Sequence, residues 1–348
     1  MDPQARFDVT ARNVAEVVSE EELRSILSKD QGLKAYVGLE PSGLVHLGTG
    51  PILAQKLTDF CAAGFDVTVL LADWHAYIND KLEGDWDSIR ACAEYLREAY
   101  RSLGVPEEVH YVYASELVAD SEYWRSVIGV SKASTIARIK RAMSIMGRQE
   151  QEAEMDASKL IYPAMQVVDI HVLDLDLALG GMDQRHAHML YRDLAPRLGW
   201  KQVVAVHTPM LSSLQGGGRM DSWDLKMSKS RPETCIFIHD TPEEIEEKIR
   251  RAYCPPREAE GNPILQFSQH LLFPHFARLK VEREPKHGGD VVFEDYDSLE
   301  DAYRQGDLHP QDLKGGVARY LVEFLKGPRE YFERRPDSLG RVKAALGL

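Results

Sequence analysis

The sequence predicts an α/β protein in which a parallel β-sheet flanked by helices is followed by a mostly α-helical carboxyl-terminal domain. Between residues 34 and 206, short apolar and β-branched runs alternate with longer amphipathic stretches, which is the pattern of βαβ units. After Ile238 the strand signal ends and helical patterns follow. A chain of 348 residues is also long enough for two domains, which we place at residues 1–239 and 240–348.

Five apolar runs are the expected strands of the sheet: residues 35–39, 65–72, 109–113, 175–179 and 203–206. Between the first two, residues 51–63 are expected to form a helix that ends at Gly64, because glycine tolerates the left-handed conformation. An earlier helix should begin after Ser19, which opens a capping-box pattern. The segment 241–244 (Thr-Pro-Glu-Glu) is a second such start, and the chain should end in a helix beginning at Pro310.

Composition excludes several classes of protein. A net charge of −13 argues against non-specific binding of nucleic acid over the whole surface, so any such contact must be local. The four cysteines form no C-x-x-C pair, which disfavours a zinc site or a disulfide framework and fits a reducing cytoplasm. No amino-terminal signal segment and no bilayer-spanning apolar run is present, so we expect a soluble protein without a membrane partner.

A glycine-rich turn, residues 41–50 (Pro-Ser-Gly-Leu-Val-His-Leu-Gly-Thr-Gly), follows the first expected strand and precedes its helix. Such a turn lets the backbone approach a phosphate and directs the positive end of the next helix toward the same place. His46 in this turn can donate a hydrogen bond to phosphate oxygens. Taken alone, the turn is more typical of an ordinary connection with a surface histidine.

A second segment, residues 226–230 (Lys-Met-Ser-Lys-Ser), follows the last strand and three glycines at 216–218. Its lysines and hydroxyls can neutralise the charge that builds up on departing pyrophosphate, although a lysine-serine loop by itself is usually a solvated connection. In this order the two segments resemble the His-x-Gly-His and Lys-Met-Ser-Lys-Ser signatures of class I aminoacyl-tRNA synthetases, whose nucleotide-binding sheet is of the Rossmann type. The first signature departs at Thr49, which can hydrogen-bond a phosphate but carries no positive charge.

A third segment, residues 162–171 (Tyr-Pro-Ala-Met-Gln-Val-Val-Asp-Ile-His), spaces three polar side chains by four and three residues. Tyr162, Gln166 and Asp169 therefore share one face of a helix, and Pro163 indicates that this helix begins close to Tyr162. Alone, such a triple is typical of the wet face of an amphipathic helix. The segment 180–185 (Gly-Gly-Met-Asp-Gln-Arg) is likewise typical of any strand-to-helix turn.

Together these segments resemble the Tyr-Pro-x-Met-Gln-x-x-Asp and Gly-Gly-x-Asp/Glu-Gln elements of tyrosyl-tRNA synthetases of the archaeal/eukaryotic type. Further similarity at residues 36–43, 70–77 and 252–255 extends the resemblance over nearly the whole chain. It implies a tyrosine–tRNA ligase, which activates L-tyrosine with ATP to tyrosyl-adenylate and transfers the tyrosine to the 3′-terminal adenosine of tRNA(Tyr).

The resemblance also assigns roles to individual side chains. It implies that Tyr36 and Asp169 hold the phenolic hydroxyl of the substrate and that Tyr162, Gln166 and Gln184 hold its α-amino group. Rejecting phenylalanine in this way leaves a buried donor and acceptor unpaired, a discrimination for which tyrosyl-tRNA synthetases are the established example. The residues implied for ATP are His46, Gly48, Thr49, Gly181, Asp183, Lys226, Ser228 and Lys229, of which His46, Thr49, Lys226 and Lys229 are the expected catalytic ones.

The expected chemistry needs no enzyme nucleophile, because the substrate carboxylate itself attacks the α-phosphorus of ATP. Catalysis should come from positioning and electrostatic stabilisation, with Mg²⁺ bound to ATP. No protein metal site is expected. Four histidines are interpreted instead as core, supporting or surface residues, since no full ligand set accompanies them: His75, His171, His186 and His188.

The resemblance further implies partners. A helical connective region at about residues 115–157 is inserted in the nucleotide-binding fold, contributes to a homodimer interface and lies near the tRNA acceptor stem. Its basic stretch 132–148 fits an RNA contact about as well as a solvated helix face. In the carboxyl-terminal domain, His287, His309 and Asp312 are the expected anticodon contacts. The alternative for His309 and Asp312 is that they only form the start of a helix, with Asp312 complementing the helix dipole.

Three alternatives remain open at the level of sequence. A tryptophanyl-tRNA synthetase shares the architecture and signatures but has no use for the Tyr36/Asp169 pair. An adenylyltransferase for a small cofactor also uses an H-x-G-H turn, although the complete 226–230 segment and the long helical domain count against it. A catalytically silent paralogue that only binds RNA is disfavoured by the intact Lys226, Lys229 and Gln184.

Overall fold

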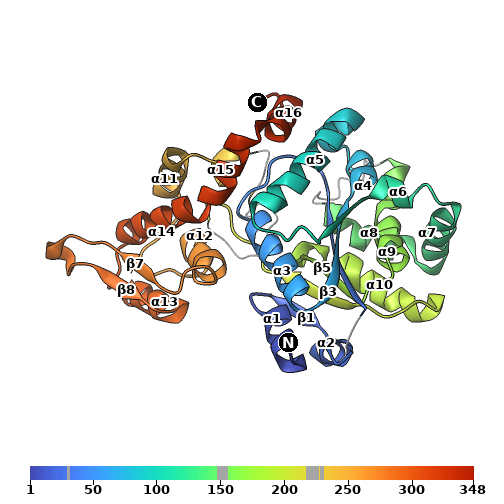
Figure 1. The fold of residues 1–348 in the computed structure, drawn as a ribbon, viewed down its shortest axis with the longest axis horizontal. Coiled ribbons are helices and arrows are strands. Elements are labelled where there is room, and N and C mark those ends of the chain that lie inside the picture. The colour runs from blue at the N-terminus through green and yellow to red at the C-terminus, as the bar shows by residue number, and fades with distance from the viewer. Residues whose placement is uncertain (30–31, 147–155, 217–226, 228–230) are drawn as a thin grey trace. The chain divides into compact units, whose positions relative to one another are not determined.

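The computed structural model describes residues 1–29, 32–146, 156–216, 227 and 231–348. The chain divides into two compact units (Figure 1). The first contains residues 1–43, 53–209 and 337–348, and the second contains residues 44–52 and 210–336. The short segment 44–52 joins the second unit because it pairs with that unit's backbone: Leu47 N donates to Ile236 O at 2.9 Å and Ile238 N donates to Val45 O at 3.1 Å.

The first unit is built on a six-stranded sheet in the order β1-β6-β5-β2-β3-β4. All neighbouring strands are parallel except β1, which pairs antiparallel with β6. The strands are β1 Glu16–Val18, β2 Leu33–Leu39, β3 Phe65–Leu71, β4 His110–Tyr113, β5 Leu177–Gly181 and β6 Val204–Thr208. The predicted α/β fold with a parallel sheet is therefore confirmed, and each of the five expected strands is present within one or two residues of its expected bounds.

The order of the strands fixes where a ligand can bind. The chain passes from β2 outward to β3 and β4, and then returns to the other side of β2 to form β5 and β6. The strand order reverses between β2 and β5, and in open α/β sheets ligands bind beyond the carboxyl ends of the strands at such a switch point. Tyr36 lies on β2, and the Gly180–Gly181 pair lies at the carboxyl end of β5.

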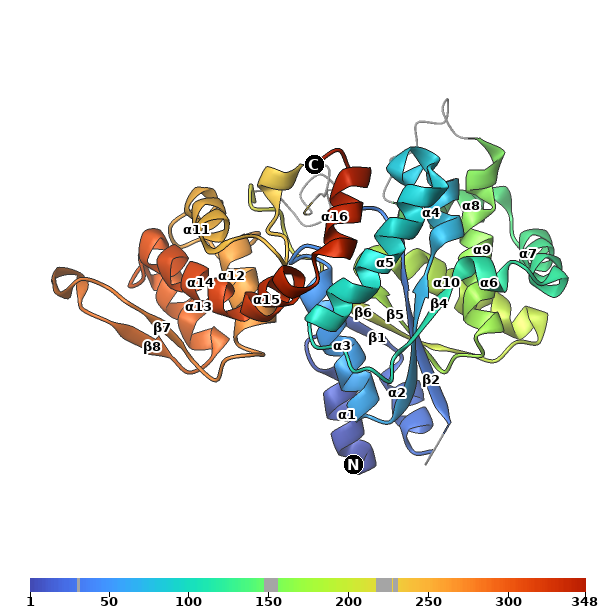
Figure 2. The same ribbon diagram turned by 45° about the horizontal axis from the view of Figure 1, so that its top comes forward.

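Helices cover both faces of this sheet, with α3 and α5 on one side and α9 and α10 on the other (Figures 1 and 2). Burial from both sides explains why β3, β5 and β6 read as almost continuous apolar runs. The helices of the unit are α1 Pro3–Ala11, α2 Glu20–Leu27, α3 Gly50–Ala62, α4 Asp73–Ile78, α5 Trp86–Ser102, α6 Ala114–Leu117, α7 Ser121–Ala133, α8 Ile136–Ala142, α9 Tyr162–Val172 and α10 Arg185–Leu198.

Local signals set several helix ends as expected. α3 stops before Gly64, whose φ of 83° is a left-handed conformation. α2 starts after Ser19, whose hydroxyl accepts from Glu22 N at 3.2 Å. The Glu22 carboxylate does not complete the capping box but accepts from Arg192 of α10 at 2.7 Å. A tertiary ion pair thus replaces the local contact.

The strand β1 was not predicted. It contains only three residues, and all three are partly exposed, so it leaves no apolar run in the sequence. Its position is fixed by tertiary pairing with β6, in which Val17 lies opposite Val206. Between β4 and β5 the helices α6, α7 and α8 occupy the expected connective region, and α7 packs against α9.

The second unit is mostly helical, as expected, and α14 packs against α11. Its helices are α11 Pro242–Arg251, α12 Pro263–Phe267, α13 Tyr296–Gln305, α14 Pro310–Phe324 and α15 Lys326–Arg334, and α16 Pro336–Ala345 follows in the chain. The capping box at Thr241 is complete, since Glu244 N donates to Thr241 Oγ1 at 3.2 Å and Thr241 N donates to Glu244 Oε2 at 2.8 Å.

Two expectations for this region were wrong. Strands do occur after Ile238: β7 Leu279–Val281 and β8 Val291–Phe293 form an antiparallel pair beside α14 (Figure 2). Each has three residues, too few to show an alternating pattern. The helix that begins at Pro310 is also not the last one, because α15 and α16 follow it after short interruptions. No helix in the described part of the chain is both long enough and apolar enough to cross a membrane.

Candidate active site

The expected phenol-binding pair lies together in the interior of the first unit. Tyr36, on the central strand β2, and Asp169, on α9, each have only 1% of their surface exposed. Burial raises the pKa of Tyr36 well above its usual value, and the nearby Asp169 carboxylate raises it further, against the opposing effect of a hydrogen bond with Gln166. Tyr36 is therefore a neutral hydroxyl that faces a carboxylate.

Asp169 has two further partners from other elements. Tyr123 of α7 donates to Asp169 Oδ1 at 2.7 Å and lies 3.3 Å from the backbone oxygen of Met165. His75 of α4 places its Nε2 atom 3.1 Å from Asp169 Oδ2. Burial and the Asp169 carboxylate both raise the pKa of Tyr123. Asp169 is therefore held through both carboxylate oxygens.

His75 is also almost completely buried, at 2% exposed. Burial alone lowers its pKa, but the neighbouring Asp169, Glu40 and Asp73 carboxylates outweigh burial, and the net pKa is raised. Sequence reasoning treated His75 only as a core or supporting residue and missed Tyr123 altogether. The similarity over residues 70–77 was a signal for His75, whereas Tyr123 comes from the connective region and has no local signal.

Tyr162 begins α9 and anchors the expected amino-group end of the site. Its hydroxyl donates to Glu40 Oε1 at 3.2 Å, and the same oxygen accepts from Asn79 Nδ2 at 2.9 Å. Lys81 Nζ lies 3.5 Å from the other Glu40 oxygen. Burial, followed by Glu40, raises the pKa of Tyr162, which stays a neutral donor. Glu40 is a site residue that sequence reasoning did not single out, although it lies in the 36–43 segment of similarity.

The two glutamines expected beside the amino group are joined to each other. Gln166 Nε2 donates to Gln184 Oε1 at 3.2 Å, and Gln184 Nε2 donates to the backbone oxygen of Ile145 at 3.3 Å. Because a carbonyl oxygen has two lone pairs, Gln184 Oε1 can accept a second hydrogen bond from a ligand. The predicted convergence of Tyr162, Gln166 and Asp169 on one face of α9 is consistent with these contacts.

The turn after β5 brings the expected ribose-binding residues together. A Cβ atom added at Gly181 would lie 2.6 Å from Asp183 Oδ1, and one at Gly180 would lie 2.8 Å from the Cβ atom of Gln184. A side chain at Gly180 would collide with the start of the Gln184 side chain, and one at Gly181 would displace the Asp183 carboxylate. The turn keeps Asp183 close to the strand end and positions Gln184 at the start of α10.

Residues 44–50 of the glycine-rich signature belong to the second unit. His46 is buried, and its Nδ1 atom accepts a hydrogen bond from Gly48 N at 3.1 Å. In a neutral imidazole the proton is then on Nε2, which makes this atom a donor. A Cβ atom at Gly48 would lie 3.1 Å from the His46 ring and 3.2 Å from Met227 Sδ, so glycine fits best there. Thr49 is exposed, and its N–H donates to His46 O at 3.1 Å.

Three residues of the second signature, Lys226, Ser228 and Lys229, lie outside the described residues. Of the expected anticodon residues, His309 is the N-cap of α14, where its Nδ1 atom accepts from Gln311 N at 3.2 Å, and Asp312 lies in the first turn. His287 ends a short 3₁₀ turn, Pro285–His287.

The other histidines have structural surroundings, in line with the interpretation from sequence. His171 stacks on Trp200 with ring centroids 3.9 Å apart, and His186 Nδ1 lies 2.8 Å from Ser144 Oγ. His188 pairs with His207 at 3.1 Å, and burial lowers its pKa to about 3. Among the described residues, no group of three or more His, Cys, Asp or Glu side chains is arranged to hold a metal ion. In the basic stretch, Arg138 pairs with Asp193 of α10.

Known proteins are similar to the chain in both sequence and fold. The sequence model of the family "tRNA synthetases class I (W and Y)" matches residues 28–326. Tyrosine–tRNA ligases of Saccharolobus islandicus and Aeropyrum pernix are 49% and 50% identical to the chain, over 95% and 94% of its length and 95% and 92% of their own. The crystal structure of the tyrosyl-tRNA synthetase from Aeropyrum pernix has a TM-score of 0.90 at 45% identity and covers both chains completely.

A structure of the Pyrococcus horikoshii tyrosyl-tRNA synthetase complexed with L-tyrosine has a TM-score of 0.92 at 38% identity, covering 99% of this chain and 100% of that one. The parallel sheet and the signature turn define a class I aminoacyl-tRNA synthetase, and the chain belongs to the family specific for tryptophan and tyrosine. Within that family it is one of the tyrosine–tRNA ligases. It activates tyrosine with ATP and joins it to tRNA(Tyr).

Proposed function

We propose that L-tyrosine binds in the first unit with its phenolic hydroxyl at Tyr36 and Asp169 and its α-ammonium group at Tyr162, Gln166 and Gln184. The observation that carries this proposal is the buried Tyr36/Asp169 pair, a donor and an acceptor with about 1% exposure each. A phenylalanine side chain at this place would leave both without their partner, at a cost that a tyrosine avoids.

The charge of the ammonium group calls for a carboxylate at the other end. Glu40 accepts from the Tyr162 hydroxyl at 3.2 Å and lies at the carboxyl end of β2, so it is placed to complement this charge through Tyr162. The nucleotide would bind through Gly181 and Asp183 at its ribose and through His46, Gly48 and Thr49 at its phosphates. The Nε2 donor of His46, fixed by its hydrogen bond from Gly48, supports that role.

The reaction follows from these placements. The tyrosine carboxylate attacks the α-phosphorus of ATP in line, and pyrophosphate leaves. Lys226, Ser228 and Lys229 are proposed to stabilise the charge on the leaving group, together with His46. A ribose hydroxyl of the terminal adenosine of the tRNA then attacks the acyl carbon and releases AMP. The residues act by position and electrostatics, and none forms a covalent bond with the substrate.

Mg²⁺ is proposed to bind with ATP. When bound, the ion would neutralise part of the phosphate charge. The proposed charge stabilisation by Lys226, Ser228, Lys229 and His46 would add to this effect.

We further propose a cytoplasmic homodimer with residues 1–239 as the catalytic domain and 240–348 as the anticodon domain. The connective region, about residues 115–157, would supply the dimer contacts and lie near the acceptor stem. Within 240–348, His287, His309 and Asp312 would approach the anticodon. Capping of α14 by His309 supports this, because it fixes the segment that carries Asp312. The capping role and an RNA contact are compatible.

Exchange of pyrophosphate into ATP, measured with single amino acids, tests the proposed pocket. Tyrosine should support exchange, and tryptophan and phenylalanine should not, because neither offers a hydroxyl to Tyr36 and Asp169. A variant Asp169→Ala should lose part of this preference. Full retention of tyrosine preference in that variant would place the phenol elsewhere.

A further inference from the structure

The Asp169 carboxylate has unusual partners for a buried acid. It is 1% exposed, and its two oxygens contact Tyr123 Oη at 2.7 Å and His75 Nε2 at 3.1 Å. The first partner is a neutral hydroxyl and the second is a titratable ring. Neither is a permanent cation such as arginine. The orientation of the Asp169 carboxylate therefore depends on these two contacts.

That orientation matters for recognition. A carboxylate oxygen accepts hydrogen bonds and donates none, so a ligand without a hydroxyl leaves a buried acceptor underpaired at this place.

The surroundings of His75 suit a ring that faces negative charge. Its nearby carboxylates are Asp169 on α9, Glu40 at the end of β2 and Asp73 on α4. The ring also stands edge-on to Tyr162, with centroids 4.9 Å apart and an interplanar angle of 87°. Packing therefore fixes the plane of the imidazole beside Asp169.

Tyr123 is held equally firmly. It is 1% exposed on α7, and its ring packs edge-on against Trp124 with centroids 5.7 Å apart. α7 in turn packs against α9, which carries Asp169. The connective region thereby delivers a hydroxyl to the carboxylate from 46 residues away in the sequence.

We propose that Tyr123 and His75 are positioning residues that set the amino-acid specificity of the enzyme. They hold the Asp169 carboxylate in the orientation that accepts a phenolic hydroxyl, so that a substrate without one is rejected. This inference rests on the proposed placement of the phenol at Asp169. It assigns a role in substrate choice to the connective region as well.

The test compares Tyr123→Phe and His75→Gln with a matched control, Tyr191→Phe. Tyr191 is a buried tyrosine of the same core whose hydroxyl donates to the backbone oxygen of Lys201 at 2.7 Å, so the control also loses one hydrogen bond. The measurement is kcat/KM in pyrophosphate exchange for tyrosine and for phenylalanine. Thermal unfolding of each variant reports any purely structural effect.

We expect the ratio of kcat/KM for tyrosine to that for phenylalanine to fall about tenfold in Tyr123→Phe and in His75→Gln. The Tyr191→Phe control should keep the ratio within about twofold, even if its free energy of unfolding falls as far as that of Tyr123→Phe. An unchanged ratio in Tyr123→Phe, which preserves the ring and its packing, would overturn the inference. That variant decides the question even if His75→Gln does not fold.

A fourth variant, Asp169→Asn, separates this inference from the proposed function. If Asp169→Asn lowers the ratio and the two positioning variants do not, the phenol site stands and the inference fails. If Asp169→Asn also leaves the ratio unchanged, the phenol does not bind at Asp169 and both proposals fail. A lowered ratio in all three supports both.

Discussion

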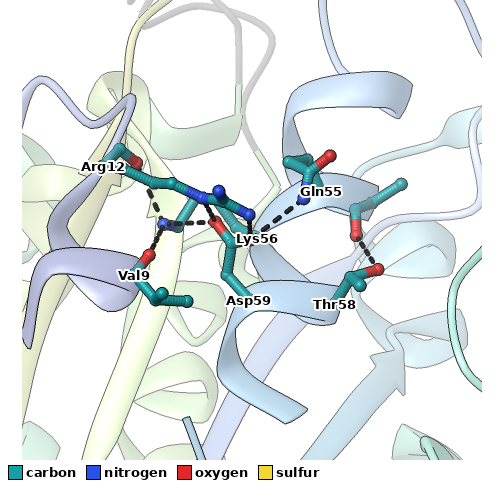
Figure 3. Close-up of polar contacts among 7 residues, drawn as sticks. Val9, Arg12, Gln55, Lys56, Thr58 and Asp59 are labelled. Atoms are coloured by element: carbon teal, nitrogen blue, oxygen red, sulfur yellow. Dashed lines mark hydrogen bonds and ion pairs between the residues drawn. The ribbon is translucent and has the colours of Figure 1, made fainter. Parts of the chain in front are cut away.

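Two carboxylates of the first unit are equally buried but have different partners. Asp59 of α3 and Asp169 of α9 are each 1% exposed. Asp59 contacts two basic side chains and an amide: Arg12 forms an ion pair with it, Lys56 Nζ donates at 2.9 Å and Gln55 Nε2 donates at 2.9 Å (Figure 3). Among the residues that the structure describes, Asp169 contacts a hydroxyl and an imidazole.

The cluster around Asp59 also satisfies its cations. Lys56 has no exposed surface, and its Nζ atom donates to the backbone oxygens of Val9 and Arg12 at 3.0 Å each (Figure 3). Burial lowers the pKa of Lys56 to about 8, and the neighbouring Asp59 opposes that shift. The cluster ties residues 9–12 to α3. Every charge in it has a partner within the protein.

The difference indicates how a structural acid is distinguished from a recognition acid. Fixed cations compensate Asp59 fully, so a further donor would add little. The partners of Asp169 are weaker donors, and a substrate hydroxyl can still contribute to its stabilisation. Substitution by asparagine should therefore lower mainly the stability at Asp59 and mainly the recognition of tyrosine at Asp169.

Asp59→Asn should cause the largest change in stability. It leaves Lys56 and Arg12 without a charge partner, and Lys56 is fully buried, so we expect a loss of about 3 kcal/mol in the free energy of unfolding. Urea unfolding measures it. Selectivity for tyrosine over phenylalanine in the remaining folded enzyme should be unchanged. A loss below about 1 kcal/mol would show that the cluster is not a compensated structural core.

Asp169→Asn should mainly change catalysis. Loss of the charged acceptor should lower kcat/KM for tyrosine about 30-fold, or roughly 2 kcal/mol in transition-state binding. The free energy of unfolding should stay within about 1 kcal/mol of the wild type, because the asparagine amide oxygen can still accept the hydrogen bond from Tyr123. Steady-state exchange kinetics and urea unfolding on one preparation give both numbers. A stability loss as large as that of Asp59→Asn would remove the distinction between the two acids.

The pH dependence of the free energy of unfolding should show how strongly Asp59 is compensated. Burial alone raises the pKa of Asp59, but Arg12, Lys56 and Gln55 outweigh it, and the net pKa lies below the usual value of an aspartate. Its contribution to stability is therefore fully present above the unfolded pKa and is lost as the pH falls through the lower, folded pKa. Urea midpoints of wild type and Asp59→Asn should converge as the pH is lowered from 6 toward 3. Parallel curves would contradict the lowered pKa.

Some of these features leave a local pattern in the sequence, and others do not. The five parallel strands were predictable because each is a continuous apolar run, and the spacing of Tyr162, Gln166 and Asp169 gave the shared face of α9. Local spacing carried no information on Tyr123, which reaches Asp169 through packing of α7 on α9. Short elements such as β1 and the β7–β8 pair were missed for the same reason, since tertiary pairing rather than local pattern holds them.

Gln55→Ala gives the smallest expected effect and makes the comparison quantitative. It removes one of the donors to Asp59, but both cations remain and alanine favours the helix, so the free energy of unfolding should fall by less than about 1 kcal/mol. Removing the Tyr123 hydroxyl in Tyr123→Phe should cost more, because the contacts of Asp169 among the described residues include no lysine or arginine that would compensate the carboxylate. Each variant deletes one neutral donor to a buried acid. Urea unfolding gives the free energy of unfolding of both variants, and pyrophosphate exchange gives the selectivity of Tyr123→Phe for tyrosine. If Gln55→Ala costs as much as Asp59→Asn, the amide rather than the cations stabilises Asp59, and the contrast between the two acids would have to be rebuilt on hydrogen-bond number instead of charge.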